Sequence, residues 1–120
     1  MSYKATRKNE AYQYQAAGHF DCKTTRLHDP QDVNEGVIVN GITHFLPGGG
    51  SEVAPSKFEM IYFVLSGEMT VTLIGEDGKE EKVCMKAGDS VHFGKGTQRG
   101  LVNTGCVSSE MMTIMIKPQA

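Results

Sequence analysis

The chain has 120 residues and a formal net charge of −2 at pH 7, and 39% of its residues are hydrophobic while 14 are glycine. This length suits one domain with a single core, and the many glycines favour numerous short strands joined by turns. The small negative charge excludes a basic surface for a polyanion, so we expect no nucleic-acid partner. No apolar targeting segment or run of about 18 apolar residues occurs, so we expect no membrane partner and a cytoplasmic location.

Residues 1–18 are polar, with Tyr3, Tyr12 and Tyr14 as aromatic anchors. They predict an arm or edge strand that packs against the domain or against a partner subunit, because tyrosine buries area while keeping a polar group. A frayed tail is the alternative. Residues 19–120 are predicted to form one domain.

The first strand of this domain is predicted at residues 19–28, followed by a turn at residues 29–36. His19, Cys22 and His28 are zinc-ligand types, but an extended strand sends His19 and Cys22 to opposite faces. We therefore expect ordinary strand residues here. The three cysteines of the chain are widely spaced and include no C-x-x-C pair, which predicts reduced thiols.

Residues 36–46, GVIVNGITHFL, predict the next strand, with a bulge or bend at Gly41. Alternation leaves two orientations open. The residues that face the interior are either Ile42, His44 and Leu46, or Thr43 and Phe45. In the first orientation His44 is the candidate catalytic acid or base, although a lone inward histidine is more often a satisfied core residue.

Residues 58–66 are apolar on both faces, which predicts a buried strand whose outer face is covered by a second sheet or another subunit. The sequence GEDG at residues 75–78 predicts a hairpin between two further strands. In the short strand at residues 90–93, His92 is expected to point away from the core. The remaining strands are predicted at residues 69–74, 81–86 and 111–116.

Two glycine-bounded segments carry a distinctive spacing. From Gly48 to Gly67 the sequence reads G-x5-A-x-S-x3-M-x6-G, and from Gly88 to Asn103 it reads G-x5-G-x-G-x2-R-x3-N. This spacing resembles the two motifs of the cupin family, G-x5-H-x-H-x3-E-x6-G and G-x5-P-x-G-x2-H-x3-N. The resemblance covers about residues 36–117 and implies a small single-domain cupin, an all-β double-stranded β-helix or jelly-roll barrel of the RmlC-like type.

In this resemblance, the positions of the family's metal ligands hold Ala54, Ser56, Met60 and Arg99. Three imidazoles and a carboxylate suit ions such as Fe, Mn, Ni, Cu or Zn. Alanine cannot ligate, serine and methionine are poor ligands for these ions, and a guanidinium repels them. We therefore expect no metal and no other cofactor. A site made from His44, Glu52 and water is left open.

Arg99 is the most informative of these substitutions. An unpaired guanidinium facing an apolar interior costs several kcal/mol, so Arg99 needs a carboxylate partner, access to solvent at the rim, or an anionic ligand. In the last case it holds a carboxylate or phosphate through two parallel hydrogen bonds. The side chains expected to complete the pocket are Ser56, Tyr62, Asn103 and His44, with Met60 as apolar lining.

The sequence thus predicts a small-molecule-binding barrel of unassigned activity, independent of metal, with an anionic ligand at Arg99. Two alternatives stay open: a metal-dependent dioxygenase or decarboxylase with non-standard ligands, and a non-catalytic structural or ligand-sensing barrel. Whether the protein is an enzyme is also open, because a fold does not determine a function. We further expect a homodimer, because the barrel interior can cover only one apolar face of residues 58–66.

Overall fold

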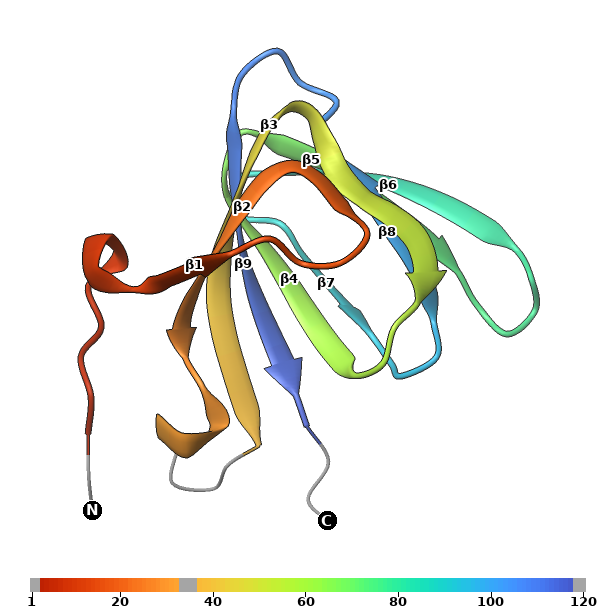
Figure 1. Ribbon diagram of the computed structural model, residues 1–120. Coiled ribbons are helices and arrows are strands. Elements are labelled where there is room, and N and C mark those ends of the chain that lie inside the picture. The colour runs from red at the N-terminus through yellow and green to blue at the C-terminus, as the bar shows by residue number, and fades with distance from the viewer. Residues whose placement is uncertain (1–2, 33–36, 118–120) are drawn as a thin grey trace.

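Nine antiparallel strands dominate the computed structural model, which describes residues 3–32 and 37–117 (Figure 1). Two short 3-10 helices, η1 (Lys8–Glu10) and η2 (Pro30–Asp32), lie before β1 and after β2. Within the described residues, no helix has the length and apolar character that a membrane span needs. The predicted all-β fold class is confirmed. The strands are β1 (Tyr12–Tyr14), β2 (His19–His28), β3 (Ile38–Pro55), β4 (Glu59–Ser66), β5 (Glu68–Ile74), β6 (Glu80–Lys86), β7 (Ser90–Phe93), β8 (Gln98–Val102) and β9 (Ser109–Ile116).

Three predicted segments extend beyond the described residues. The predicted turn at residues 29–36 begins as η2, and residues 33–36 lie outside the described part of the chain. Residues 1–2 of the predicted arm and residues 118–120 of the predicted domain lie outside it as well.

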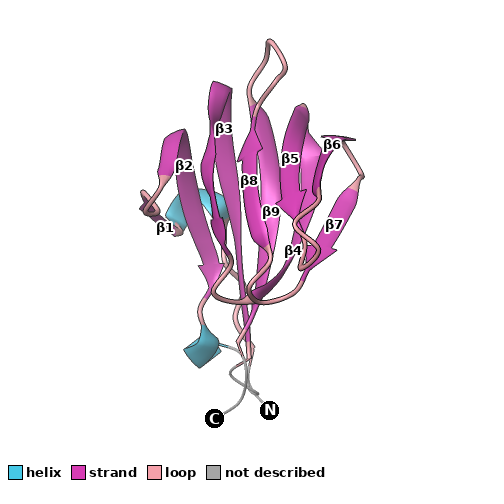
Figure 2. Cartoon of the chain, turned by 90° about the vertical axis from the view of Figure 1, so that its right-hand side faces the viewer, coloured by secondary structure: helices cyan, strands magenta, loops and turns pink. Residues whose placement is uncertain are grey.

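Strand β3 connects the two faces of a nearly closed barrel (Figure 1, Figure 2). Its residues 38–45 pair with β9, whereas its residues 50–55 pair with β8. One face therefore has the order β7-β4-β9-β3, and the other has the order β3-β8-β5-β6. Strand β2 pairs with β3, and β1 pairs with β2. This arrangement confirms the jelly-roll barrel predicted from the motif spacing.

A glycine-rich corner at residues 47–50 lets β3 pass from one face to the other. Gly48 has a φ of 82°. A Cβ atom on Gly49 would lie 2.2 Å from the backbone oxygen of Asp21, and one on Gly50 would lie 2.0 Å from that of Leu101. Only glycine allows backbones to approach this closely, so this corner fixes how the two faces meet.

Alternation along β4 buries Met60 and Tyr62. On β3 Thr43 and Phe45 are among the buried side chains, whereas His44 between them is exposed on the outer surface. The orientation that places His44 inside the barrel is therefore wrong. Pairing with β2 and β9 sets this orientation, which leaves Phe45 1% exposed and Leu46 51% exposed.

The N-terminal segment lies against β2. Tyr12 is opposite Arg26 in the antiparallel ladder between β1 and β2. The phenol oxygen of Tyr14 accepts a hydrogen bond of 2.6 Å from Arg26, whose guanidinium carbon also lies 5.0 Å from the centroid of the Tyr14 ring. These contacts hold the segment that leads into β2, and that segment borders a cavity inside the barrel.

Candidate functional site

A cavity of about 350 Å³ lies inside the barrel. Its volume is within the range of about 300–1,000 Å³ that small-molecule sites occupy. Side chains from both faces of the barrel line it, and the turn at residues 16–19 borders it as well. The apolar lining would take a bound molecule out of water, so the polar side chains among it decide how that molecule is oriented. The larger apolar members of the lining are Phe45, Phe58, Met60, Leu101, Met111 and Met115.

The four positions that the motif spacing relates to metal ligands come together in this cavity. Ala54 lies opposite Arg99 in the ladder between β3 and β8. Met60 belongs to β4, and Ser56 lies in the connection between β3 and β4. All four residues line the cavity. The motif spacing therefore identifies one wall of the site from the sequence.

These four side chains do not fit a divalent metal, because they supply neither an imidazole nor a carboxylate. The alternative pair of His44 and Glu52 is not brought together. Glu52 lines the cavity, whereas His44 lines a separate depression on the outer surface. Within residues 3–32 and 37–117, no group of three or more His, Cys, Asp and Glu side chains could hold a metal ion.

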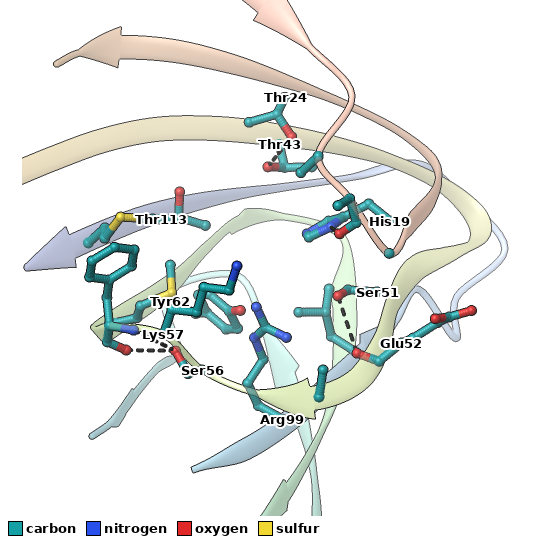
Figure 3. A pocket seen from close by; sticks show the side chains of 18 of the residues that line it. His19, Thr24, Thr43, Ser51, Glu52, Ser56, Lys57, Tyr62, Arg99 and Thr113 are labelled. Carbon is teal, nitrogen blue, oxygen red and sulfur yellow. Dashed lines mark hydrogen bonds between the residues drawn. The ribbon is translucent and has the colours of Figure 1, made fainter. Parts of the chain in front are cut away.

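Arg99 reaches from β8 into the cavity (Figure 3). It takes part in none of the salt bridges found among the described residues. Its Nε atom is buried and has no hydrogen-bond partner in the described structure. A buried donor without a partner costs about 1–3 kcal/mol. Arg99 is therefore a cationic side chain with unused hydrogen-bonding capacity at the cavity wall.

Tyr62 lies beside Arg99 in the cavity lining and is 3% exposed. Its ring meets that of Phe93 edge to face, with 5.0 Å between the two centroids. Burial raises the pKa of the Tyr62 phenol, and the nearby Arg99 guanidinium acts in the opposite direction. Burial is the larger effect, so the phenol stays protonated at neutral pH and can donate a hydrogen bond.

Lys57 is a second cation at the cavity, and it is not among the residues predicted from the sequence. Its exposed side chain reaches toward the same space as Arg99 (Figure 3). Ser56 forms the turn that carries it, because the Ser56 hydroxyl donates to the Phe58 carbonyl at 2.6 Å. Ser56 thus lines the cavity as predicted, but its proton is already used within the chain. The position of Lys57 beside a motif residue is the signal that could have revealed it.

Three threonines supply hydroxyl groups that the motifs do not mark. Thr24 on β2 and Thr43 on β3 are opposite each other, and their Oγ1 atoms are 3.2 Å apart. Both are buried, and Thr113 on β9 lines the same cavity. These hydroxyls come from strands distant in sequence, so only the folded register reveals them as a set.

Asn103 does not line the cavity, contrary to the prediction. Its Nδ2 donates to the carbonyls of Phe45 at 3.3 Å and Val107 at 2.8 Å, and its Oδ1 accepts from the amide of Gly105 at 2.9 Å. Strand β8 ends at Val102, so the alternation that would turn Asn103 inward does not continue. The buried amide holds the loop between β8 and β9 instead.

Several solved structures share this architecture. The polyketide cyclase RemF from Streptomyces resistomycificus superposes with a TM-score of 0.77 at 18% identity, over 98% of this chain and 81% of its own. A protein described as a predicted oxalate decarboxylase from Thermotoga maritima superposes with a TM-score of 0.78 at 20% identity, over 96% of this chain and 100% of its own. An RmlC-like cupin from Shewanella frigidimarina superposes with a TM-score of 0.73 at 17% identity, over 98% of this chain and 94% of its own. At these identities the likeness shows the fold alone.

The sequence comparisons define the family. A protein named beta-D-galactosidase Rv1717, from Mycobacterium tuberculosis, is 36% identical over 100 residues, which are 83% of this chain and 82% of that protein. Residues 41–115 match the family model of the cupin domain. With the jelly-roll barrel and the convergence of both motifs on one cavity, the chain belongs to the cupin family.

Proposed function

We propose that this cupin binds a small organic anion in its barrel cavity without a metal, with Arg99 as the main anchor. The observation that carries the proposal is the buried Nε of Arg99, which has no partner among the described residues. A carboxylate or phosphate accepts two parallel hydrogen bonds from a guanidinium. A ligand held through Nε and one Nη would satisfy the buried donor and the charge together.

The rest of the lining favours an anion that also carries hydroxyl groups. Lys57 adds a second positive charge, while Thr24, Thr43 and Tyr62 offer hydroxyl donors and acceptors. The relative named as a galactosidase supports a carbohydrate-like ligand. We therefore propose a sugar acid or a similar hydroxylated carboxylate or phosphate as the ligand class.

Metal independence is the second part of the proposal, because the four motif positions offer no imidazole or carboxylate. The test is elemental analysis of protein expressed in medium supplemented with Fe, Mn, Ni and Zn. We expect no stoichiometric transition metal. About one metal ion per chain would favour the metal-dependent dioxygenase or decarboxylase alternative.

A second candidate function is hydrolysis of a β-D-galactoside, which the 36% identity to the named galactosidase favours. Most glycosidases use two carboxyl groups about 5 to 9.5 Å apart. Among the described residues that line the cavity, Glu52 is the one carboxylate. Release of p-nitrophenol from p-nitrophenyl β-D-galactoside, lost in Glu52→Gln, would support this function, and no release would reject it.

Thermal melting of wild type, Arg99→Ala and Arg99→Lys tests anion binding. The probes are phosphate, citrate, D-galactonate and D-galacturonate, with neutral D-galactose for comparison. We expect an anion to raise the Tm of the wild type. The binding free energy of the anion should weaken by about 2–5 kcal/mol in Arg99→Ala and by less in Arg99→Lys. The lysine keeps the charge but cannot donate the two parallel hydrogen bonds of a planar guanidinium.

The matched control is Lys95→Ala, which removes one positive charge from an exposed loop outside the cavity. It should respond to the anions as the wild type does. If no anion shifts the Tm of the wild type, the non-catalytic structural barrel becomes the better description.

A further inference from the structure

We infer that His19 is the acid–base residue of this cavity, in the role that the sequence had suggested for His44. The inference rests on the proposed anion site, because it needs a ligand anchored at Arg99. His19 begins β2 and lines the cavity, and it borders from another side the space that Arg99 and Lys57 enter (Figure 3). A ligand that fills the cavity would therefore contact both Arg99 and His19.

A tight turn fixes the position of His19. The amide of His19 donates to the carbonyl of Ala16 at 3.2 Å, and Gly18 has a φ of 74°, which a turn of this kind requires of its third residue. The Gly18 carbonyl accepts from the amide of Glu52 at 3.0 Å. The side chain of Gln15 donates to the carbonyl of His19 at 2.9 Å. These bonds fasten the turn to β3, so the imidazole is carried on a rigid element.

The hydrogen bond of the ring identifies its tautomer. Nδ1 of His19 lies 3.0 Å from the carbonyl oxygen of Ala17. A carbonyl oxygen only accepts hydrogen bonds, so Nδ1 carries the proton. In the neutral imidazole Nε2 then holds a free lone pair, and no hydrogen bond to Nε2 is found among the described residues. This is the state that a general base needs.

Charged groups of both signs line the cavity beside His19. The other titratable side chains of the lining are Tyr14, Glu52, Lys57, Tyr62 and Arg99. An anion held by Arg99 and Lys57 would therefore lie in the same cavity as the His19 imidazole.

This arrangement suits removal of a proton from the carbon next to a ligand carboxylate. The C–H bond breaks, and an N–H bond forms at Nε2 of His19. The electron pair moves onto the carboxylate oxygens, where the Arg99 guanidinium stabilises the developing charge. Return of a proton from His19 to the same face of this carbon restores the acid with its configuration unchanged, so exchange of this proton with solvent is the net reaction. The step needs no oxidant and no co-reactant.

The test compares three variants with the wild type. His19→Asn removes the base, while its amide can still donate to Ala17 from a position close to that of Nδ1. His44→Asn is the matched control, because His44 is exposed on the outer surface. Arg99→Ala removes the proposed anion anchor. Each protein is incubated with D-galactonate and D-galacturonate in D₂O, and ¹H NMR follows loss of the proton next to the carboxylate.

We expect the wild type and His44→Asn to exchange this proton at equal rates. His19→Asn should slow the exchange by at least about 100-fold, the lower end of general-base contributions. In protein labelled with ¹⁵N-histidine, the His19 signal, assigned by its loss in His19→Asn, should show a protonated Nδ1 and an unprotonated Nε2 above neutral pH. The opposite tautomer would overturn the inference.

Two further outcomes separate this inference from the proposed function. In the first outcome, an anion raises the Tm of wild type and His19→Asn alike, so anion binding stands. His19 is then not the base if neither sugar acid exchanges its proton, or if His19→Asn exchanges it as fast as the wild type. If no anion raises the Tm of the wild type, the proposed function fails and this inference fails with it.

Discussion

Arg99 is a positive charge set among apolar neighbours, opposite Ala54 in the ladder and beside Leu101 in the cavity wall. Its removal should therefore leave the empty protein as stable as before or stabilise it by about 1 kcal/mol, because an unpaired donor and charge disappear. Urea unfolding of wild type and Arg99→Ala without anions measures this. A loss of several kcal/mol would mean that Arg99 is half of a structural ion pair.

Tyr62 is expected to lower the stability of the folded protein at alkaline pH. Burial raises the pKa of its phenol in the folded state, so the folded chain keeps this proton at a pH where the unfolded chain loses it. The resulting stability is fully present below about pH 10, where tyrosine titrates in unfolded chains, and is lost as the pH rises toward the folded-state pKa. The free energy of unfolding should thus fall with pH above about pH 10.

Phenylalanine at this position removes the titrating group and keeps the ring. Tyr62→Phe should therefore show a smaller loss of stability between pH 9 and pH 11 than the wild type, when urea unfolding is measured across about this range. The same pH dependence in both proteins would assign the effect to other groups.

At the scale of elements, the corner in β3 is the most demanding part of the backbone. Alanine at position 50 would place a Cβ atom 2.0 Å from the backbone oxygen of Leu101, and neither strand can yield without breaking the ladder between β3 and β8. Gly50→Ala should cost at least about 3 kcal/mol or prevent folding.

Gly94 provides the matched control, because a Cβ atom there meets nothing within 4 Å. Gly94→Ala should change the free energy of unfolding by no more than about 0.5 kcal/mol, as surface substitutions usually do. Urea unfolding compares the two variants. Equal stabilities would show that the corner accommodates a side chain.

Local sequence predicted those parts of the fold that depend on spacing and alternation. The motif spacing predicted that Ala54, Met60 and Arg99 line one wall of the cavity, and alternation along the strand predicted that Met60 and Tyr62 point inward. The orientation of β3 could not be predicted, because Ile42 and Leu46 on its other face are as apolar as Phe45. Pairing with β2 and β9 decides it.

The rest of the site depends on contacts between distant segments. Alternation put Asn103 inside, but β8 stops one residue earlier and the amide bonds to a loop. His19 was predicted as an ordinary strand residue, because no local pattern shows that the turn before it packs against Glu52. The hydroxyls of Thr24 and Thr43 likewise meet only through strand register.

For the whole molecule, we propose a homodimer formed through the outer surface of β4 and β9. On this surface Phe63 lies opposite Met112, and Ile61 lies opposite Ile114. The inward residues of β4 already fill the core, whereas these outward side chains stay partly exposed within the described part of the chain. Covering this surface with a second copy would remove apolar area from water.

Light scattering should therefore give about twice the chain mass of 13.1 kDa at micromolar concentration. Phe63→Lys should shift the population to monomer, because it puts a charge at the centre of the proposed interface. Lys95→Ala, on an exposed loop, should stay dimeric. A wild-type protein of the monomer mass would refute this interface.

The central claim is that an anion is held by Arg99 inside the barrel. The most direct measurement is a crystal structure of the wild type grown with D-galacturonate, and a second one grown with inorganic phosphate. We predict ligand oxygens at about 2.7–2.9 Å from Nε and one Nη of Arg99 in at least one of them. A cavity without an anion in both crystals, with the guanidinium bound to a carboxylate of the chain itself, would contradict the account.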